Sequence, residues 1–85
     1  MLKIERSKSK NPGITLRLEG RVIGPWVEEV RKVSEKIIAS GSTLALDLSE
    51  VTFLDREGIR LLQVLRQRQV TFLNSSVFVA EQLRS

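Results

Sequence analysis

The feature that most constrains the fold is a change of hydrophobic period near the middle of the chain. From Ser42 to Asp55, "STLALDLSEVTFLD", leucines alternate with small or polar residues and then give way to an extended run, which is typical of a strand. The next segment, from about Arg56 to Gln69, carries its apolar residues at helical spacing instead. Its apolar side, expected to face the core, consists of Ile59, Leu61, Leu62, Val64 and Leu65. A short apolar run, Val70 to Leu73, predicts another strand. In a unit of strand, helix and strand, the helix forms a right-handed crossover between two parallel strands. This stretch therefore predicts a parallel α/β core.

The segment before this unit predicts a β-hairpin. Leu2 to Arg6 and Ile14 to Glu19 each alternate apolar side chains with charged or polar ones. Between them lies a polar loop whose residues Asn11, Pro12 and Gly13 favour turn conformations. Two such strands, close in sequence and joined by a polar loop, are expected to pair with each other.

A first helix follows the hairpin. Pro25 suits its first turn, where the missing N–H of proline has no partner to lose, and Gly41 suits its C-terminal cap. Trp26, at the start of this helix, is interpreted as part of the core, with anchoring of a partner protein as the alternative.

The end of the chain predicts a short third helix with Ser75 or Ser76 as its N-cap. Its inward-facing residues are expected to be Val77, Val79, Ala80 and Leu83. The resulting order β-β-α-β-α-β-α predicts a single α/β domain over residues 1–85, in which about three helices pack on a mixed four-stranded sheet.

Composition excludes several classes of function. The 85 residues include no cysteine and no histidine, so the usual zinc sites and Ser-His or Cys-His nucleophiles cannot be built from this chain alone. The central carboxylates Asp47, Asp55 and Glu57 have simpler structural uses. We therefore expect no enzymatic activity, no catalytic residue, no metal and no cofactor.

Hydropathy and charge indicate where the protein works. No apolar run approaches the about 18 residues that cross a bilayer, and the N-terminus lacks the apolar region of a signal peptide. We expect a cytoplasmic protein that does not insert into a membrane.

The net charge of +4 comes from two separate segments and is more typical of a solvated surface than of a nucleic-acid site, so no nucleic-acid partner is expected.

The segment "LALDLSEVTFLDREGIRLLQVL" resembles the central part of STAS domains, the fold of bacterial anti-sigma factor antagonists. The stretch "LEGRVIGPWVEEV" is similar to the family's first helix and the strand before it. The stretch "SSVFVAEQLR" is similar to the helix that follows a later strand of the family. Many family members continue into a further strand and helix. The resemblance therefore implies an uncovered sheet edge, which a partner or a homodimer would cover.

The resemblance also implies a phosphorylation position. In the family, the residue just before the glycine of the strand-to-helix junction is typically a serine, less often a threonine, that a partner kinase phosphorylates. Here that position is Glu57, which has no hydroxyl, and Arg56 stands where a small residue is usual. Another hydroxyl could take this role, and the candidates are Ser49, Thr52, Ser75 and Ser76.

The junction residues have structural uses as well. Asp55 is expected to be an N-cap that accepts a hydrogen bond from the amide of Glu57 or Gly58, and Glu57 lies favourably at the positive end of the helix dipole. Gly58 is costly in a helix, so it indicates the close approach of another backbone, either the domain's own or a partner's. Arg56 and Arg60 lie one turn apart. They form either an ordinary solvated face or a docking patch, which would predict an acidic partner surface.

Together these inferences predict a protein-interaction module without the usual switch. The candidate partner-binding residues are Thr52, Asp55, Arg56, Glu57, Gly58 and Arg60. The implied partner is an anti-sigma factor or serine kinase-like protein. The alternative is a STAS subunit that docks on the ATPase of a phospholipid-transport complex, and weak nucleotide binding stays open.

Overall fold

The computed structural model describes residues 2–8 and 13–84, which form four strands and three helices. In chain order these are β1 (Leu2–Lys8), β2 (Gly13–Val22), α1 (Pro25–Ala39), β3 (Thr43–Leu54), α2 (Arg56–Gln67), β4 (Thr71–Leu73) and α3 (Val77–Gln82). The expected order β-β-α-β-α-β-α is confirmed. The predicted turn residues Asn11 and Pro12 lie outside the described residues.

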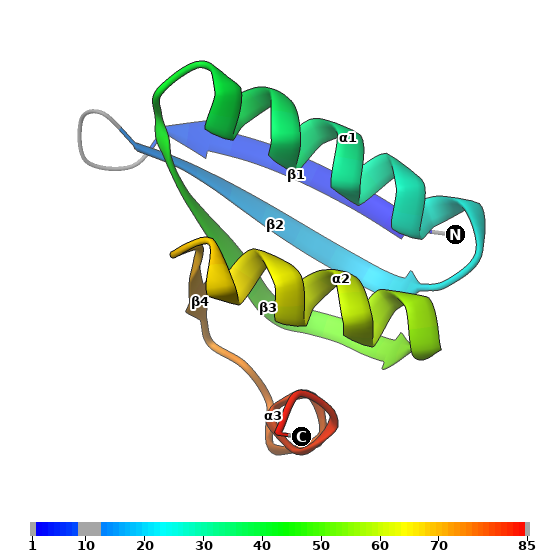
Figure 1. Cartoon of the computed structure of the whole chain (residues 1–85). Helices are drawn as coiled ribbons and strands as arrows, with labels where there is room; N and C mark the ends of the chain where they lie inside the picture. The colour runs from blue at the N-terminus through cyan, green and yellow to red at the C-terminus, as the bar shows by residue number, and fades with distance from the viewer. Residues whose placement is uncertain (1, 9–12, 85) are drawn as a thin grey trace.

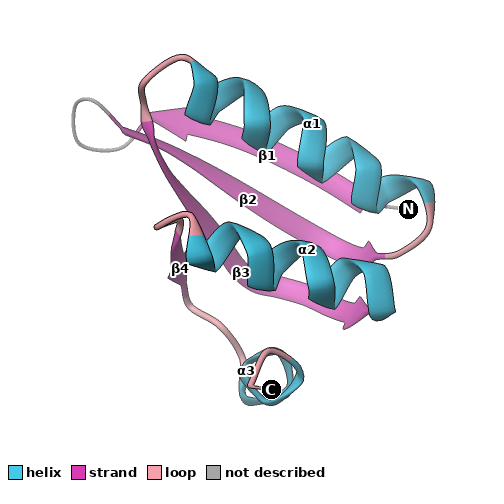
Figure 2. Cartoon of the chain, in the orientation of Figure 1, coloured by secondary structure: helices cyan, strands magenta, loops and turns pink. Residues whose placement is uncertain are grey.

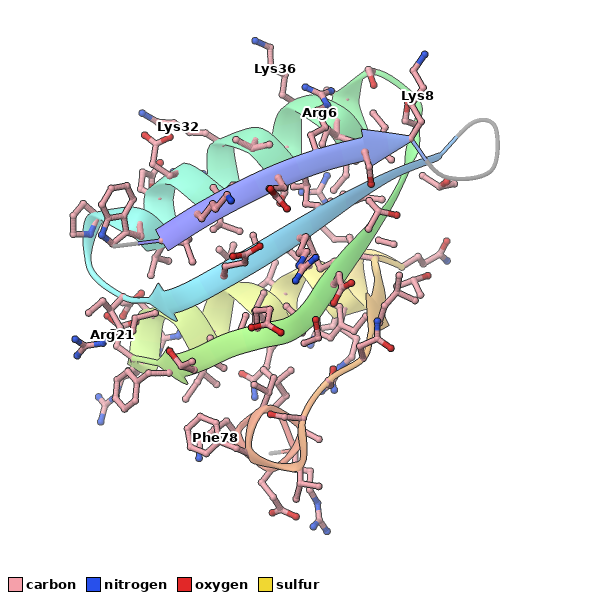
Figure 3. The ribbon with its side chains drawn as sticks, turned by 180° about the vertical axis from the view of Figure 1, so that it is seen from behind. Arg6, Lys8, Arg21, Lys32, Lys36 and Phe78 are labelled. Atoms are coloured by element: carbon pink, nitrogen blue, oxygen red, sulfur yellow. The ribbon has the colours of Figure 1, made fainter. Side chains whose placement is uncertain are left out.

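The four strands form one mixed sheet in the order β1-β2-β3-β4. β1 pairs antiparallel with β2, as the hairpin prediction requires, while β2, β3 and β4 are parallel. α1 and α2 lie across one face of this sheet (Figure 1) and are coloured as helices in Figure 2. Seen from behind, the other face of the sheet is not covered by any described helix (Figure 3). The core therefore lies on one side of the sheet only.

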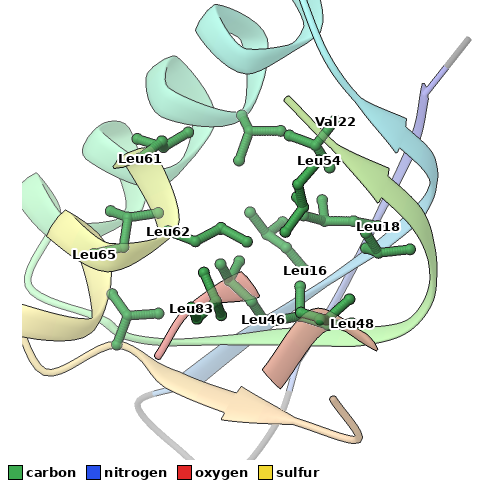
Figure 4. Packing of buried hydrophobic residues seen from close by; sticks show 14 of the residues in the cluster. Leu16, Leu18, Val22, Leu46, Leu48, Leu54, Leu61, Leu62, Leu65 and Leu83 are labelled. Carbon is green, nitrogen blue, oxygen red and sulfur yellow. The ribbon is translucent and has the colours of Figure 1, made fainter. Parts of the chain in front are cut away.

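The core is built mainly from leucines of β2, β3 and α2 (Figure 4). Trp26 of α1 is partly buried and packs against this cluster, so its assignment to the core is confirmed. The buried strand positions are Leu2 on β1, Leu16, Leu18 and Val22 on β2, and Leu44, Leu46, Leu48, Val51 and Leu54 on β3.

Irregular pairing keeps the second half of β3 in phase with β2. Buried residues recur at intervals of two along β2 but at intervals of three after Leu48 in β3. The register contains two shifts, one between Arg17 and Glu19 and one between Gly20 and Arg21, and each gives β3 one extra residue. These bulges return Val51 and Leu54 to the core side of the sheet.

α2 ends two residues before the expected boundary at Gln69. Gln69 adopts a left-handed conformation with φ 69°, so it cannot continue the helix. The N–H of Val70 donates to the carbonyl of Leu65, and the N–H of Gln69 donates to the carbonyl of Arg66. This is the Schellman arrangement, which satisfies the last helical carbonyls and turns the chain into β4.

α3 differs from its sequence-based prediction in the side it buries. Ser76 is its N-cap, with the hydroxyl accepting from the N–H of Val79, and Val79 and Leu83 are buried as expected. Val77, however, is 81% exposed and Ala80 is exposed, so both assignments to the core were wrong. A helix of six residues at the end of the sheet contacts the core through one i, i+4 stripe only.

A carboxylate stabilises the first bulge of β3. One oxygen of Asp47 accepts from the N–H of Ser49 at 3.0 Å, and the other accepts from the amide of Asn74 at 3.4 Å. The bond from the backbone of Ser49 is the main cause that lowers the pKa of Asp47, and Asn74 and the positive charge of Arg17 act in the same direction. Asp47 thus connects the bulge to the segment that follows β4.

We expect this carboxylate to make stability depend on pH. Because its pKa is lower in the folded state, the ionised form stabilises the fold above the unfolded pKa of about 3.9, and this contribution disappears as the pH falls through the folded pKa. Asp47→Asn should lower the free energy of unfolding by about 0.5–1.5 kcal/mol at neutral pH. Urea unfolding at a series of pH values, with Glu81→Gln as an exposed control, checks this. A loss that persists unchanged in strong acid would contradict it.

Candidate functional site

The junction between β3 and α2 is held by the side chain of Asp55. Its Oδ1 accepts from the N–H of Gly58 at 2.7 Å, which confirms the predicted N-cap. Its Oδ2 accepts from the N–H of Gly24 at 2.9 Å, in the loop between β2 and α1. The N–H of Asp55 itself donates to the carbonyl of Val22 at 3.3 Å. One residue therefore fixes the start of α2 against the end of β2 and the start of α1.

Gly58 is explained by the domain's own backbone. It is buried in the first turn of α2, and a Cβ at this position would lie 2.5 Å from the carbonyl oxygen of Val22. Of the two neighbours that the sequence left open, the structure shows the intramolecular one. Gly58 allows α2 to approach β2 and presents no side chain to a partner.

The charged residues of the first turns of α2 face outward. Arg56, Glu57 and Arg60 are exposed, and among the described residues none of their side chains forms a hydrogen bond or an ion pair. On α1, Glu28 pairs with Arg31, and Glu35 pairs with Arg68, the C-cap residue of α2, so neither carboxylate pairs with Arg56 or Arg60. The unpaired charges of α2 are thus available to groups outside the domain.

Two hollows border these residues. Arg56 and Arg60 line an open one of about 390 Å³ together with Ile59 and Gln63. Glu57 and Arg60 also line a groove of about 250 Å³ between α1 and α2. The apolar residues of this groove are Val27, Leu61 and Val64. Val64, which was expected to face the core, is 44% exposed because it lies in the wall of this groove.

Thr52 lies apart from the other candidates. It is exposed and lines a third hollow with Lys3, Glu19 and Glu50. The structure therefore brings Asp55, Glu57 and Gly58 together at the helix start, but it does not bring Thr52 into the same hollow.

Sequence reasoning missed an exposed aromatic residue beside the junction. Phe53 is 45% exposed, and the guanidinium of Arg21 lies over its ring at 5.8 Å from the ring centre. The two residues are register partners at the ends of β3 and β2, next to the core positions Leu54 and Val22. A cation over an aromatic face is favourable, and it holds Phe53 at the surface. The apolar run Val51 to Leu54 does not indicate that Phe53 is exposed, because the bulges of β3 decide which side of the sheet Phe53 faces.

Metal and membrane sites were also sought among the described residues. They contain no group of three or more histidine, cysteine, aspartate or glutamate side chains arranged to hold a metal ion. Within the same residues, no helix is long and apolar enough to span a membrane.

Comparison with known proteins identifies the class. A model of the STAS domain family matches residues 5–80, and the chain therefore belongs to this family. Eleven chains of solved structures match it as well. One of them is the anti-sigma factor antagonist SpoIIAA in its unphosphorylated form, with a TM-score of 0.75 and 20% identity over 93% of this chain and 79% of that chain. At this identity the likeness shows a shared fold. A search among curated proteins finds no significant match.

We expect the close contact at Gly58 to dominate its mutational effect. Gly58→Ala should gain about 1 kcal/mol of helix propensity but force α2 away from the carbonyl of Val22, at a cost of about 1–3 kcal/mol. Because the blocking atom belongs to the backbone, the net result is a less stable protein. Urea unfolding measures this, with Gln67→Ala as a control on the exposed side of α2. A variant as stable as the original chain would show that the contact is absent.

Proposed function

We propose that the protein is a non-enzymatic interaction module of a bacterial partner-switching pathway, resembling an anti-sigma factor antagonist. The observation that carries this proposal is the start of α2, where unpaired Arg56, Glu57 and Arg60 surround a backbone fixed by Asp55. The SpoIIAA-like fold and the family membership support it. In this role the protein acts in the cytoplasm and binds an anti-sigma factor or a serine kinase-like protein.

The chemistry of the surface defines what the partner offers. The partner is expected to present carboxylates to Arg56 and Arg60, since guanidinium groups bind carboxylates through paired hydrogen bonds. Phe53, held by Arg21, supplies an apolar contact of the type that often dominates interface energetics. Asp55 and Gly58 contribute indirectly, because they position the first turn of α2.

Glu57 makes binding independent of phosphorylation at this position. A phosphate would bring about −1.5 to −2 charges and three acceptor oxygens, whereas glutamate carries a permanent single charge at neutral pH. The side chain of Glu57 is exposed and takes no part in the Asp55 contacts, so the replacement leaves the helix start intact.

The same residue favours a second candidate function. A STAS subunit that docks on the ATPase of a phospholipid-transport complex needs no phosphorylation, and a fixed glutamate in place of a hydroxyl fits such a constitutive contact. The two functions differ in their partner, so direct binding measurements distinguish them.

We expect binding to depend on the arginines of α2. The anti-sigma factor kinases and the transport ATPases encoded in the same genome are to be purified and titrated with the protein by calorimetry. Arg60→Glu should weaken binding to the true partner by about tenfold or more, because it replaces an attraction to carboxylates by repulsion. Arg84→Glu, the same charge change at the far end of the chain, should bind normally. Equal affinities of Arg60→Glu and the original chain would rule out this surface.

We also expect that a kinase partner cannot phosphorylate the original chain at the junction. Incubation with the kinase and ATP should leave the intact mass unchanged, whereas Glu57→Ser should gain a single phosphate because the hydroxyl is restored. Glu57→Ala serves as the control that removes the carboxylate without adding an acceptor. A phosphate on the original chain would instead show that another hydroxyl accepts it, with Ser49, Thr52, Ser75 and Ser76 as the candidates, and would contradict the absence of a switch.

A further inference from the structure

A second group of unpaired charges lies far from the start of α2. Several basic side chains are occupied by partners within the fold. Arg66 donates to the carbonyl of Leu83, and the ion pairs involve Lys3, Arg17, Arg31, Arg68 and Arg84. Outside α2, the side chains of four described basic residues form no ion pair, hydrogen bond or ring contact, namely Arg6, Lys8, Lys32 and Lys36. We call these four residues the basic edge.

The topology brings these residues together from two segments. Leu2 and Ile4 of β1 contact the core, and the alternation of the strand places Arg6 and Lys8 on the same side, toward α1. Lys32 and Lys36 lie one turn apart on the exposed surface of α1. All four side chains lie along the same margin of the molecule, at the top of Figure 3.

The basic edge presents charge without a shaped pocket. Arg6 lines a hollow that Glu5 and Asp47 also line. The other three residues are lysines, whose ammonium groups are flexible point charges rather than planar forks. Nearby acids do not cancel it: Glu5 pairs with Lys3 and Glu35 pairs with Arg68, which leaves Glu29 as the unpaired carboxylate on α1. Such a surface attracts a broad, charge-dense partner rather than a compact ligand.

We propose that the basic edge binds the surface of a membrane that contains anionic lipids. Flexible lysines suit a fluid layer of head groups, because attraction to an anionic bilayer requires no fixed hydrogen-bond geometry and amounts to about 1 kcal/mol per basic residue. Nucleic acid fits less well, since the edge holds one arginine and no aromatic side chain on which bases could stack. The contact is peripheral and leaves the fold outside the bilayer.

The position of the basic edge leaves the start of α2 free. Lys8 pairs with Ile14 at the beginning of β2, and β3 also begins at this end of the sheet. Asp55 and α2 begin at the other end, where β2 and β3 finish. A membrane-bound molecule would therefore expose its α2 charges to the cytoplasm, so membrane binding and partner binding are compatible.

Vesicle flotation tests the proposal. The full chain is mixed with extruded vesicles of phosphatidylcholine, alone or with phosphatidylglycerol, at low and at high salt. Binding is expected only to the anionic vesicles and only at low salt, because salt screens exposed charges. Arg6→Gln with Lys8→Gln, and separately Lys32→Gln with Lys36→Gln, should each weaken binding about 25-fold, which corresponds to about fivefold per residue. Circular dichroism confirms that the variants fold.

The control removes the same charge elsewhere. Lys3→Gln with Arg84→Gln lowers the net charge equally, and it should bind anionic vesicles like the original chain. An equal loss in this control would attribute the binding to net charge and overturn the proposal. Equal binding to neutral vesicles would overturn it as well. A third outcome would also overturn the proposal: the chain binds a DNA duplex, as measured by fluorescence anisotropy in the same buffer, loses this binding in the basic-edge variants, and does not bind vesicles.

Discussion

The structure depends on the two hydrogen bonds that the carboxylate of Asp55 accepts. One comes from Gly58 in α2 and the other from Gly24 before α1, so a single side chain joins the beginnings of both helices. The carbonyl of Val22 completes the arrangement, since it accepts from the N–H of Asp55 and lies where a Cβ of residue 58 would stand. A carboxylate that accepts two amide hydrogen bonds stabilises the junction more than an N-cap alone.

The two bulges of β3 make this junction possible. Without the first extra residue, strict alternation would turn Val51 away from the core that Leu46 and Leu48 enter, and the second extra residue keeps Leu54 on the core side after Val51. Because the bulges bring β3 back into register with β2, Leu54 is buried opposite Val22. Asp55 follows directly, and its N–H donates to the carbonyl of Val22. Asp47, whose carboxylate accepts from the N–H of Ser49 at the first bulge, therefore supports the junction from a distance.

The sequence predicted the element order and the N-cap because both depend on local patterns. The spacing of apolar residues distinguishes a strand from a helix. An aspartate directly before a helix commonly serves as its N-cap. It could not predict the bond from Gly24 or the neighbour of Gly58, since these depend on how α1 and α2 are placed over β2. The exposure of Val77 was missed for a similar reason, because apolar character alone does not show which stripe of a short helix meets the sheet.

The junction separates residues that fix the backbone from charged residues that are exposed at the surface. Asp55 and Gly58 are occupied by contacts within the domain, so selection for a partner can act on Arg56, Glu57 and Arg60 without disturbing the fold. The side chain of Glu57 is exposed and takes no part in the Asp55 contacts, so a change of charge at position 57 leaves the helix start intact. Because charge at position 57 and geometry at position 55 are set by different side chains, the helix start can keep its geometry while its surface charge changes.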